Sequence, residues 1–274
     1  MCRSARVCWG VGILLAAIAL GAGFSGCGKS SERHNVLLIT IDTTRADYIG
    51  CYGLSDVKTP AIDGLAAQGV RFARNVSTSQ CTNPSHSSIL TGLYLARHQV
   101  YDNRTPLSDK ALTLSEIFKN QGYATLGAVS ARHLKPSNSG FGQGFDTFLA
   151  TDQPSIPASV RNQDYLAELE KLARDDFFSW VHYFDPHGDY APPAPYDTMY
   201  EPGDDHDPVP SRKSMESKVA KSQDLVDPDE IIPLYKGEIS FLDFEIGRLL
   251  ATLEKMGVAD RTLVVLIADH GESM

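Results

Sequence analysis

Two candidate nucleophiles stand side by side in the segment SQCTNPSHSSILTG (residues 79–92), namely Cys81 and Thr82. Pro84 is typical of the first turn of a helix, and residues 85–90 continue a helical pattern. Thr82 is therefore expected at a helix N-terminus, where free N–H groups and the helix dipole favour anions. Beside a divalent cation, its hydroxyl would act as an alkoxide that attacks phosphorus or sulfur. Taken alone, Thr82 is more typical of a simple helix cap.

Acidic and imidazole side chains accompany three apolar runs, each with the pattern of a strand. The runs are VLLITI (36–41), FFSWVHYF (177–184) and TLVVLIA (262–268), and the polar residues at or beyond their ends are Asp42, Thr43, His182, His187, Asp269, His270 and Glu272. In parallel sheets, reactive groups gather just beyond the carboxyl ends of the strands. Carboxylates from two strands and one imidazole suit a divalent cation. The sequence therefore predicts a cation site at Asp42, Asp269 and His270, with Thr82 beside it, for Ca, Mg, Mn or Zn.

The elements that must position these residues alternate between strand and helix patterns. Strands are expected at 36–41, 123–130, 177–184 and 262–268, and helices at 60–68, 84–90, 113–121, 165–174 and within 230–256. The runs at 36–41 and 262–268 are continuous and apolar, which is typical of interior strands covered on both faces. The alternation predicts an α/β fold, with a mostly parallel central sheet sandwiched by helices. The segment 186–229, rich in Pro, Asp and Ser, is interpreted as a long surface excursion of one domain.

The N-terminus has the pattern of an export signal rather than of a folded element. Arg3 and Arg6 precede an apolar run at residues 7–24, and small residues follow it up to Cys27. Phe24-Ser-Gly-Cys27 resembles a bacterial lipobox, so residues 1–27 are interpreted as a lipoprotein-type signal that ends at the lipidated Cys27. An uncleaved membrane anchor is the alternative. Both interpretations predict an extracytoplasmic protein that is tethered to the membrane of a bacterial cell envelope.

Charge and local context exclude two other classes of partner. The 274 residues carry a formal net charge of −9 without a basic block, which argues against nucleic acid. Residues 23–30, GFSGCGKS, match the P-loop pattern. That motif binds phosphate only between a strand and a helix, whereas a signal precedes it here, so no nucleotide is expected. Cys51 and Cys81 show no spacing that demands a disulfide or a zinc site.

Five ordered motifs then make the sequence recognisable. They are NVLLITIDTTRADYIGCYG (35–53), TNPSHSSILTG (82–92), HYFDPHGDYAPP (182–193), GEISFLDFEIGRLLATLE (237–254) and ADHGE (268–272). Together they resemble the sulfatase family of the alkaline phosphatase superfamily. The resemblance implies that residues 28–274 form a catalytic domain of that fold. Members of the family normally continue past this point with a C-terminal subdomain, so the resemblance also implies that this part is missing from the domain.

The nucleophile motif departs from the sulfatase pattern at two positions. Sulfatases have Cys or Ser, any residue, Pro, Ser and Arg, and the first residue is oxidised to formylglycine. Pro84 and Ser85 set the register, which places Thr82 at the nucleophile position and Cys81 one residue too early. Threonine does not form the aldehyde, so an alkoxide that forms a covalent ester is implied, as in phosphate-transferring branches of the superfamily. His86 replaces the arginine and is included among the catalytic residues.

The resemblance also assigns roles to other residues. Asp42, Asp269 and His270 match metal ligands, with Thr82 completing the set. Asn103 falls at the spacing of a substrate-binding asparagine, and His187 matches a histidine that contacts the transferred group or protonates the leaving oxygen. His182 is a further candidate for substrate binding. His98 and His133 are interpreted as surface or packing residues.

The leading functional hypothesis is a metal-dependent hydrolase of sulfate or phosphate esters, with Thr82 as nucleophile. Its expected substrate is an anionic ester that is linked to a glycan or a lipid. One alternative is a transferase that passes a phospho group to a membrane lipid or glycan. The other is a catalytically inactive relative that binds anionic glycans; the carboxylates of Asp42 and Asp269 argue against it, because burying them without a cation is costly.

Overall fold

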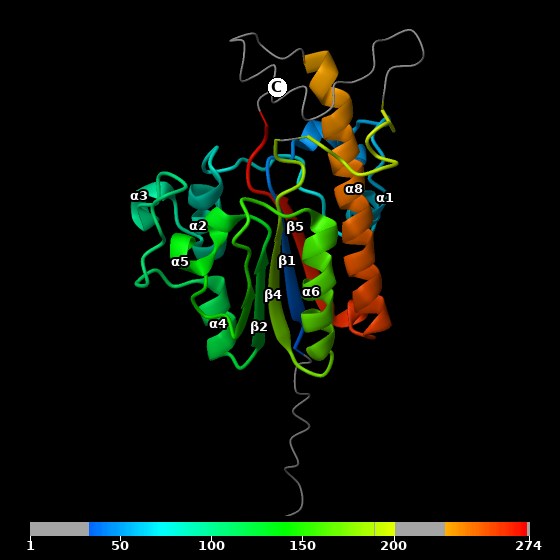
Figure 1. Ribbon diagram of the computed structural model, residues 1–274. Coiled ribbons are helices and arrows are strands. Elements are labelled where there is room, and N and C mark those ends of the chain that lie inside the picture. Colours follow the sequence, from blue (N-terminus) through cyan, green and yellow to red (C-terminus); the bar gives the residue numbers. More distant parts are fainter. Residues whose placement is uncertain (1–32, 189, 201–227, 273–274) are drawn as a thin grey trace, which may run out of the picture. The chain divides into compact units, whose positions relative to one another are not determined.

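Five parallel strands form one sheet in the computed structural model, which describes residues 33–188, 190–200 and 228–272 (Figure 1). Their order is β3-β2-β4-β1-β5. The strands are β1 (Asn35–Ile41), β2 (Ala124–Val129), β3 (Thr147–Leu149), β4 (Phe177–Tyr183) and β5 (Thr262–Ala268). Every pairing between neighbours is parallel. The predicted α/β class and the parallel sheet are confirmed.

Helices cover both faces of the sheet. On one side lie α1 (Pro60–Gln68), α6 (Ala158–Lys171) and α8 (Pro228–Lys255), and on the other α2 (Thr82–Thr91), α3 (Leu95–His98), α4 (Leu114–Asn120) and α5 (Pro136–Ser139) (Figure 1). Four short 3-10 helices are η1 (Ala46–Tyr48), η2 (Gly50–Tyr52), η3 (Arg132–Leu134) and η4 (Ala259–Arg261). Each side has its own apolar core, with Ile39 facing α8 and Leu38 facing α2.

The helix boundaries follow local chemistry. Thr113 caps α4 and forms a capping box with Glu116, because each side chain accepts the backbone N–H of the other residue. Gly92 ends α2 in a left-handed conformation at φ 69°. The first turn of α1 is capped from α8, where the Asp243 carboxylate accepts the N–H groups of Ala61 and Ile62 at 3.0 and 2.8 Å.

Three sequence predictions need correction. Helix α6 begins at Ala158 rather than at residue 165, because residues 158–164 carry polar side chains that weaken its apolar period. The short elements β3, α3 and α5 have three or four residues each, too few for a recognisable period. Strand β5 lies at the edge of the sheet, although its apolar run predicts an interior strand. Leu263 and Val265 on β5 are accordingly 57% and 38% exposed.

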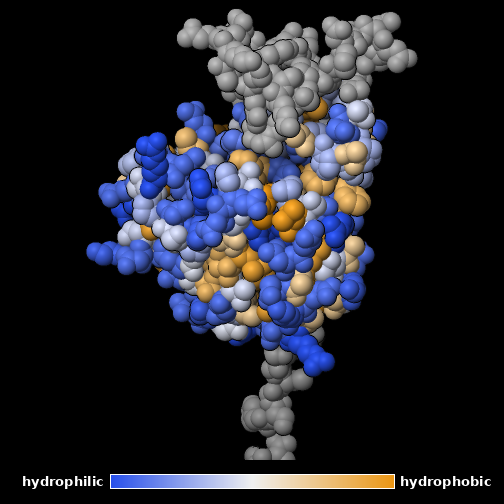
Figure 2. Space-filling view, viewed as in Figure 1, coloured by the Kyte–Doolittle hydropathy of each residue, from blue (hydrophilic) through white to orange (hydrophobic). Residues whose placement is uncertain are grey.

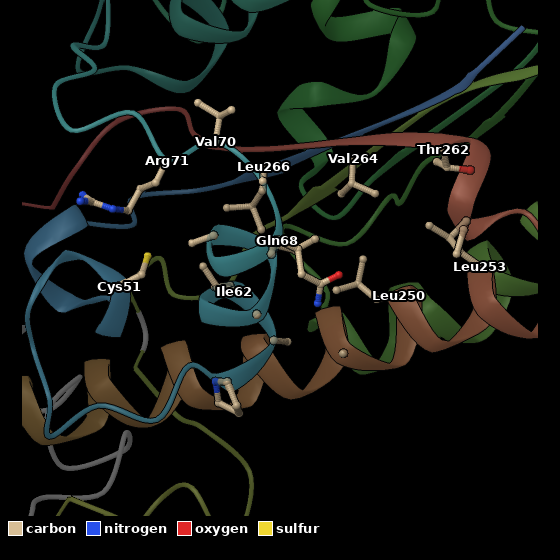
Figure 3. A pocket seen from close by; sticks show the side chains of 18 of the residues that line it. Cys51, Ile62, Gln68, Val70, Arg71, Leu250, Leu253, Thr262, Val264 and Leu266 are labelled. Carbon is tan, nitrogen blue, oxygen red and sulfur yellow. The ribbon is translucent and has the colours of Figure 1, made fainter.

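The outward surface around these elements is mostly hydrophilic. In the view of Figure 2, apolar residues gather in the middle of the face, between α4 and α6. An apolar groove of about 660 Å³ lies elsewhere, between α1, α8 and β5. Leu250 and Leu253 of α8 line this groove together with Val264 and Leu266 of β5 (Figure 3).

Some predictions concern residues outside the described part of the chain. They are the signal and lipobox at 1–27, the P-loop-like match at 23–30 and residues 201–227 of the proposed surface excursion. Among the described helices, none combines the length and the apolar character needed to cross a membrane.

Candidate active site

Asp42 and Asp269 lie side by side at the carboxyl edge of the sheet. Ile41 pairs with Ala268 in the last register position of β1 and β5, so the next residue of each strand is an aspartate. The ladder continues past the strands, because the Asp269 N–H donates to the carbonyl of Ile41 and the Asp42 N–H to that of Tyr183. Paired residues of parallel strands point to the same face. Both carboxylates therefore point to the face that α2 covers.

The turn after β1 aims backbone donors at these carboxylates. Thr43 has a φ of 45°, in the left-handed region that β-branched residues rarely adopt. Its N–H donates to Asp269 Oδ1 at 3.2 Å. Tyr235 of α8 holds this turn, since its hydroxyl donates to the Thr43 carbonyl at 2.8 Å and accepts the Arg45 N–H at 2.9 Å. The strained backbone is thus fixed from a helix on the far side of the sheet.

Asp42, Asp269 and His270 form a group that is able to hold a metal ion. One ligand atom from each lies within 4.8 Å of the others. His270 Nε2 is 3.8 Å from Asp42 Oδ1 and 3.6 Å from Asp269 Oδ2. These atoms, Asp42 Oδ2 and the Thr43 hydroxyl are buried, and none has a hydrogen-bond partner in the described chain. Buried carboxylate oxygens without donors are costly unless a cation compensates them, so the donor set fits a divalent cation.

The ionisation of the two carboxyls reflects this burial. Burial raises the pKa of Asp42 to about 6, while the nearby His187 and His270 oppose the shift. Burial also raises the pKa of Asp269 well above its usual range, and the neighbouring Asp42 charge adds to it. The two carboxyls therefore disfavour joint ionisation unless a positive charge lies between them.

Thr82 is the first residue of α2, as predicted, and is only 3% exposed. Cys81 is half-buried and precedes the helix as its N-cap. The first turn of α2 lies against β5, because Ser85 Oγ donates to the Asp269 carbonyl at 2.6 Å. Asn103 is exposed and joins the same turn: its Oδ1 accepts the Asn83 N–H at 2.9 Å.

His86 is fully buried on α2 behind this turn. Its Nδ1 lies 2.9 Å from the Thr82 carbonyl oxygen and 3.5 Å from Asp269 Oδ2, and its Nε2 lies 3.0 Å from Thr40 Oγ1. Burial lowers its pKa well below the usual value, and the neighbouring His182 adds to the effect. His86 thus contacts both the nucleophile segment and a candidate ligand.

Two histidines come from the β4 end. His182 is buried, and its Nε2 lies 3.4 Å from Asp42 Oδ2; burial, followed by nearby His133, lowers its pKa well below the usual value. His187 is exposed and stacks on Phe184 with ring centroids 4.5 Å apart. It lies close enough to Asp42 to affect the pKa of that carboxyl. Both histidines therefore lie at the carboxyl edge with the aspartates.

His133 lies near His182 and His187, close enough to affect or be affected by their charges. It follows β2 at the carboxyl edge, and its Nε2 is buried and has no hydrogen-bond partner in the described chain. Burial lowers its pKa to about 4, and nearby His187 contributes. These observations place it near the predicted site residues, while its interpretation as a surface or packing residue stays a prediction. The strand-end rule that singled out His187 applies equally to His133, which lies three residues beyond Ser130.

The arrangement can therefore bind a cation between two carboxylates and bring an anionic ester to a helix N-terminus. The groove of Figure 3 lies elsewhere, since Asp42, Thr82 and Asp269 are not among its lining residues. Its lining is mostly apolar, with Arg71, Gln68 and Glu254 among the polar residues, and it contains none of the candidate metal ligands. The chemistry of the site belongs to the carboxyl edge of the sheet rather than to this groove.

Comparison with known proteins finds relatives that match most of this chain. The multifunctional alkaline phosphatase superfamily protein PehA of Trinickia caryophylli is 29% identical over 88% of this chain and 64% of its own length. An ulvan-active sulfatase of Formosa agariphila is 28% identical over 88% of this chain and 51% of its own. The chain thus spans about half to two thirds of the length of these curated relatives.

Solved structures agree on the fold. The phosphonate monoester hydrolase SpPMH from Silicibacter pomeroyi superposes with a TM-score of 0.67 and 25% identity, covering 88% of this chain and 63% of that one. A structure of BT4656 in complex with D-glucosamine-2-N, 6-O-disulfate reaches a TM-score of 0.72 at 20% identity, covering 88% and 66%. The sequence profile described as Sulfatase matches residues 34–274, the whole folded span that carries the aspartates and α2, and the chain therefore belongs to the sulfatase family.

Proposed function

We propose that this protein is a metal-dependent hydrolase of sulfate or phosphate esters, with Thr82 as its nucleophile. The observation that carries the proposal is the group of buried, unpartnered ligand atoms on Asp42, Asp269 and His270, beside the N-terminus of α2. If Thr82 only capped helix α2, the buried carboxylates of Asp42 and Asp269 would have no role beside it. The sulfatase and phosphonate monoester hydrolase relatives support an ester hydrolase of this kind.

Each residue has a defined part in the reaction. A bound divalent cation would supply positive charge that favours the Thr82 alkoxide and the anionic ester. Thr82 Oγ attacks the sulfur or phosphorus, its proton passes to solvent, and the bond to the leaving oxygen breaks. His187 donates a proton to that oxygen. Water then attacks the threonine ester, releases sulfate or phosphate and restores the Thr82 hydroxyl. Asn103 braces the start of α2, and His182 lines the site beside Asp42.

The proposed substrate is an anionic ester carried by a glycan or a lipid. An N-acetylgalactosamine-6-O-sulfatase of Bacteroides thetaiotaomicron is 34% identical over 52% of this chain, and the ulvan-active sulfatase extends the set of relatives named for glycans. The lipobox-like Cys27 supports a place at the outer face of a bacterial membrane. Both points are parts of the proposal.

The test uses the full-length protein with an aryl sulfate and an aryl phosphodiester, before and after chelation. Turnover should disappear with the metal and return when it is added back. Thr82→Ala should lower kcat by a factor on the order of 10³ or more, while Thr82→Ser keeps part of it. Turnover unaffected by Thr82→Ala would end the nucleophile assignment. A metal-loaded protein without turnover would favour the glycan-binding relative, and products formed on added acceptors would favour the transferase.

A further inference from the structure

We propose that His86 is an uncharged positioning residue, held with its single ring proton on Nδ1, which fixes the first turn of α2 against Asp269. This inference rests on the proposed function, because it concerns the nucleophile segment and a candidate ligand. It differs from the catalytic role expected from the sequence: His86 would act through Thr82 and Asp269 and exchange no proton with the substrate.

A chain of three side chains determines which ring nitrogen carries the proton. The Trp180 indole N–H donates to Thr40 Oγ1 at 3.0 Å, and Thr40 Oγ1 lies 3.0 Å from His86 Nε2. On its other side, His86 Nδ1 lies 2.9 Å from the carbonyl oxygen of Thr82. Trp180 and Thr40 are both fully buried, so water does not compete for these bonds.

Donor and acceptor chemistry leaves one arrangement that satisfies every atom. A carbonyl oxygen only accepts, so the proton that joins His86 to Thr82 must lie on Nδ1. An indole N–H only donates, so Thr40 accepts it and keeps its own hydroxyl proton for His86 Nε2. If the proton lay on Nε2 instead, the lone pair of His86 Nδ1 would face a lone pair of the Thr82 carbonyl oxygen. With both nitrogens protonated, the Thr40 proton would be left without an acceptor.

The Nδ1 proton lies between the nucleophile segment and the cation site. Asp269 Oδ2 is 3.5 Å from the same nitrogen and has no hydrogen-bond partner among the described residues, so the Nδ1 proton is the nearest positive end of a dipole to it. A donor behind a ligating carboxylate orients that carboxylate. Together with the bond from Ser85 Oγ to the Asp269 carbonyl, His86 therefore joins the α2 turn to the end of β5 at two points. Since Thr82 is the first residue of α2, these two contacts fix the position of the Thr82 backbone and therefore of its Cβ.

Both ring nitrogens are engaged and the ring is shielded from solvent. Trp180 and His182 pack against it, with ring centroids at 5.7 and 5.1 Å, and His86 itself is 0% exposed. A proton on its way between substrate and solvent therefore has no route through this ring. The role of His86 is therefore to hold Thr82 and Asp269 in position.

The direct test is the 15N NMR spectrum of the full chain with labelled histidine, and the signals of His86 are assigned by their loss in His86→Gln. The expected pattern is a protonated Nδ1 and a bare Nε2. A proton on Nε2, or on both nitrogens, would overturn the proposal. This readout needs no turnover. A failed nucleophile test with a protonated Nδ1 would therefore reject the proposed function and leave the geometry standing.

A second test uses Thr40, which touches neither substrate nor cation. Thr40→Val removes the hydroxyl and keeps the shape, so His86 loses the donor that holds its Nε2 side in place. We expect Mn²⁺ affinity, measured by calorimetry, and kcat to fall tenfold to a hundredfold with KM nearly unchanged. Thr40→Ser, which restores the hydroxyl, should recover both. A Thr40→Val protein with full Mn²⁺ affinity and kcat, or a Thr40→Ser protein that recovers neither, would contradict the positioning role.

Discussion

The backbone N–H of Thr43 donates to Asp269 Oδ1 at 3.2 Å from a left-handed conformation with a φ of 45°. A β-branched residue adopts this conformation only where its surroundings hold it. The Tyr235 hydroxyl does so by bonding the Thr43 carbonyl and the Arg45 N–H. The loop after β1 is therefore strained in order to present a donor to the carboxylate on the neighbouring strand.

Tyr235→Phe should weaken both stability and metal binding. The change leaves the Thr43 carbonyl and the Arg45 N–H without their buried partner, at a cost of about 1–3 kcal/mol in the free energy of unfolding. Tyr165→Phe is the matched control, because its hydroxyl is also buried and bonds Ser179 at 2.7 Å, in the core. Denaturant unfolding should show a loss in both variants, and calorimetry with Mn²⁺ a weaker affinity in Tyr235→Phe alone. If Tyr235→Phe and Tyr165→Phe bound Mn²⁺ equally well, the strained turn at Thr43 would not contribute to metal binding.

Metal binding should stabilise the protein through Asp42 and Asp269. A cation that binds only the folded state at 100 times its Kd adds about 2.7 kcal/mol to the free energy of unfolding. Asp42→Asn keeps the shape and removes the charge, so this gain should vanish. Without metal, the variant should be at least as stable as the parent, because a buried charge is gone. Thermal unfolding with and without EDTA measures both effects, and a metal response that persists in Asp42→Asn would contradict the ligand assignment.

The buried Glu238 should make the free energy of unfolding fall as the pH rises from about 4.5 to about 8. Burial raises the pKa of Glu238 from 4.5 to about 8, and the Asp185 charge adds to the shift. Because the folded pKa is higher than the unfolded one, the stabilisation is complete below pH 4 and is lost as the pH rises through 8. The loss should be on the order of 5 kcal/mol. Glu238→Gln, which keeps the acceptor for the Ala191 N–H, should flatten the curve between pH 5 and 9 in urea unfolding. An unchanged slope would show that other groups cause the effect.

Because Asp243 of α8 caps the first turn of α1, we expect the stability of α1 to depend on this side chain. Asp243→Ala removes the acceptor for two N–H groups at the start of α1 and should cost about 1–2 kcal/mol of unfolding free energy. Asp243→Asn keeps one acceptor and should lose less. Hydrogen exchange should show the loss of protection in α1 first. Protection lost equally across the sheet would instead indicate a general weakening of the core.

Much of the fold follows from the sequence because its central strands are unambiguous. The runs at 36–41 and 177–184 are apolar except for Thr40, Ser179 and His182, and the structure buries nearly every residue of β1 and all of β4. The short elements β3, α3 and α5 could not be predicted, since three or four residues show no period. The start of α6 differs from the prediction because its first turns carry polar side chains. Among them is a buried Arg161, whose guanidinium donates to the distant Val129 carbonyl as well as to Asp164 on the same helix.

The part of the candidate site that lies just beyond the predicted strands could be predicted from the sequence. Asp42 and Asp269 come together because their strands are neighbours in register, which the sequence alone does not specify. His133 lay within reach of the same rule and was passed over. The hydrogen bonds among Thr40, Trp180 and His86 join three separate elements, so no local sequence pattern predicts them. Tertiary contacts of this kind decide which polar residues are structural.

Strand β5 has a practical consequence for handling this protein. Among the described residues, β5 pairs with β1 alone, and its Leu263 and Val265 are exposed. An exposed apolar edge strand is a template for strands of other molecules. Val265→Lys should therefore lower any tendency of β5 to bind other strands, which sedimentation at increasing protein concentration would measure.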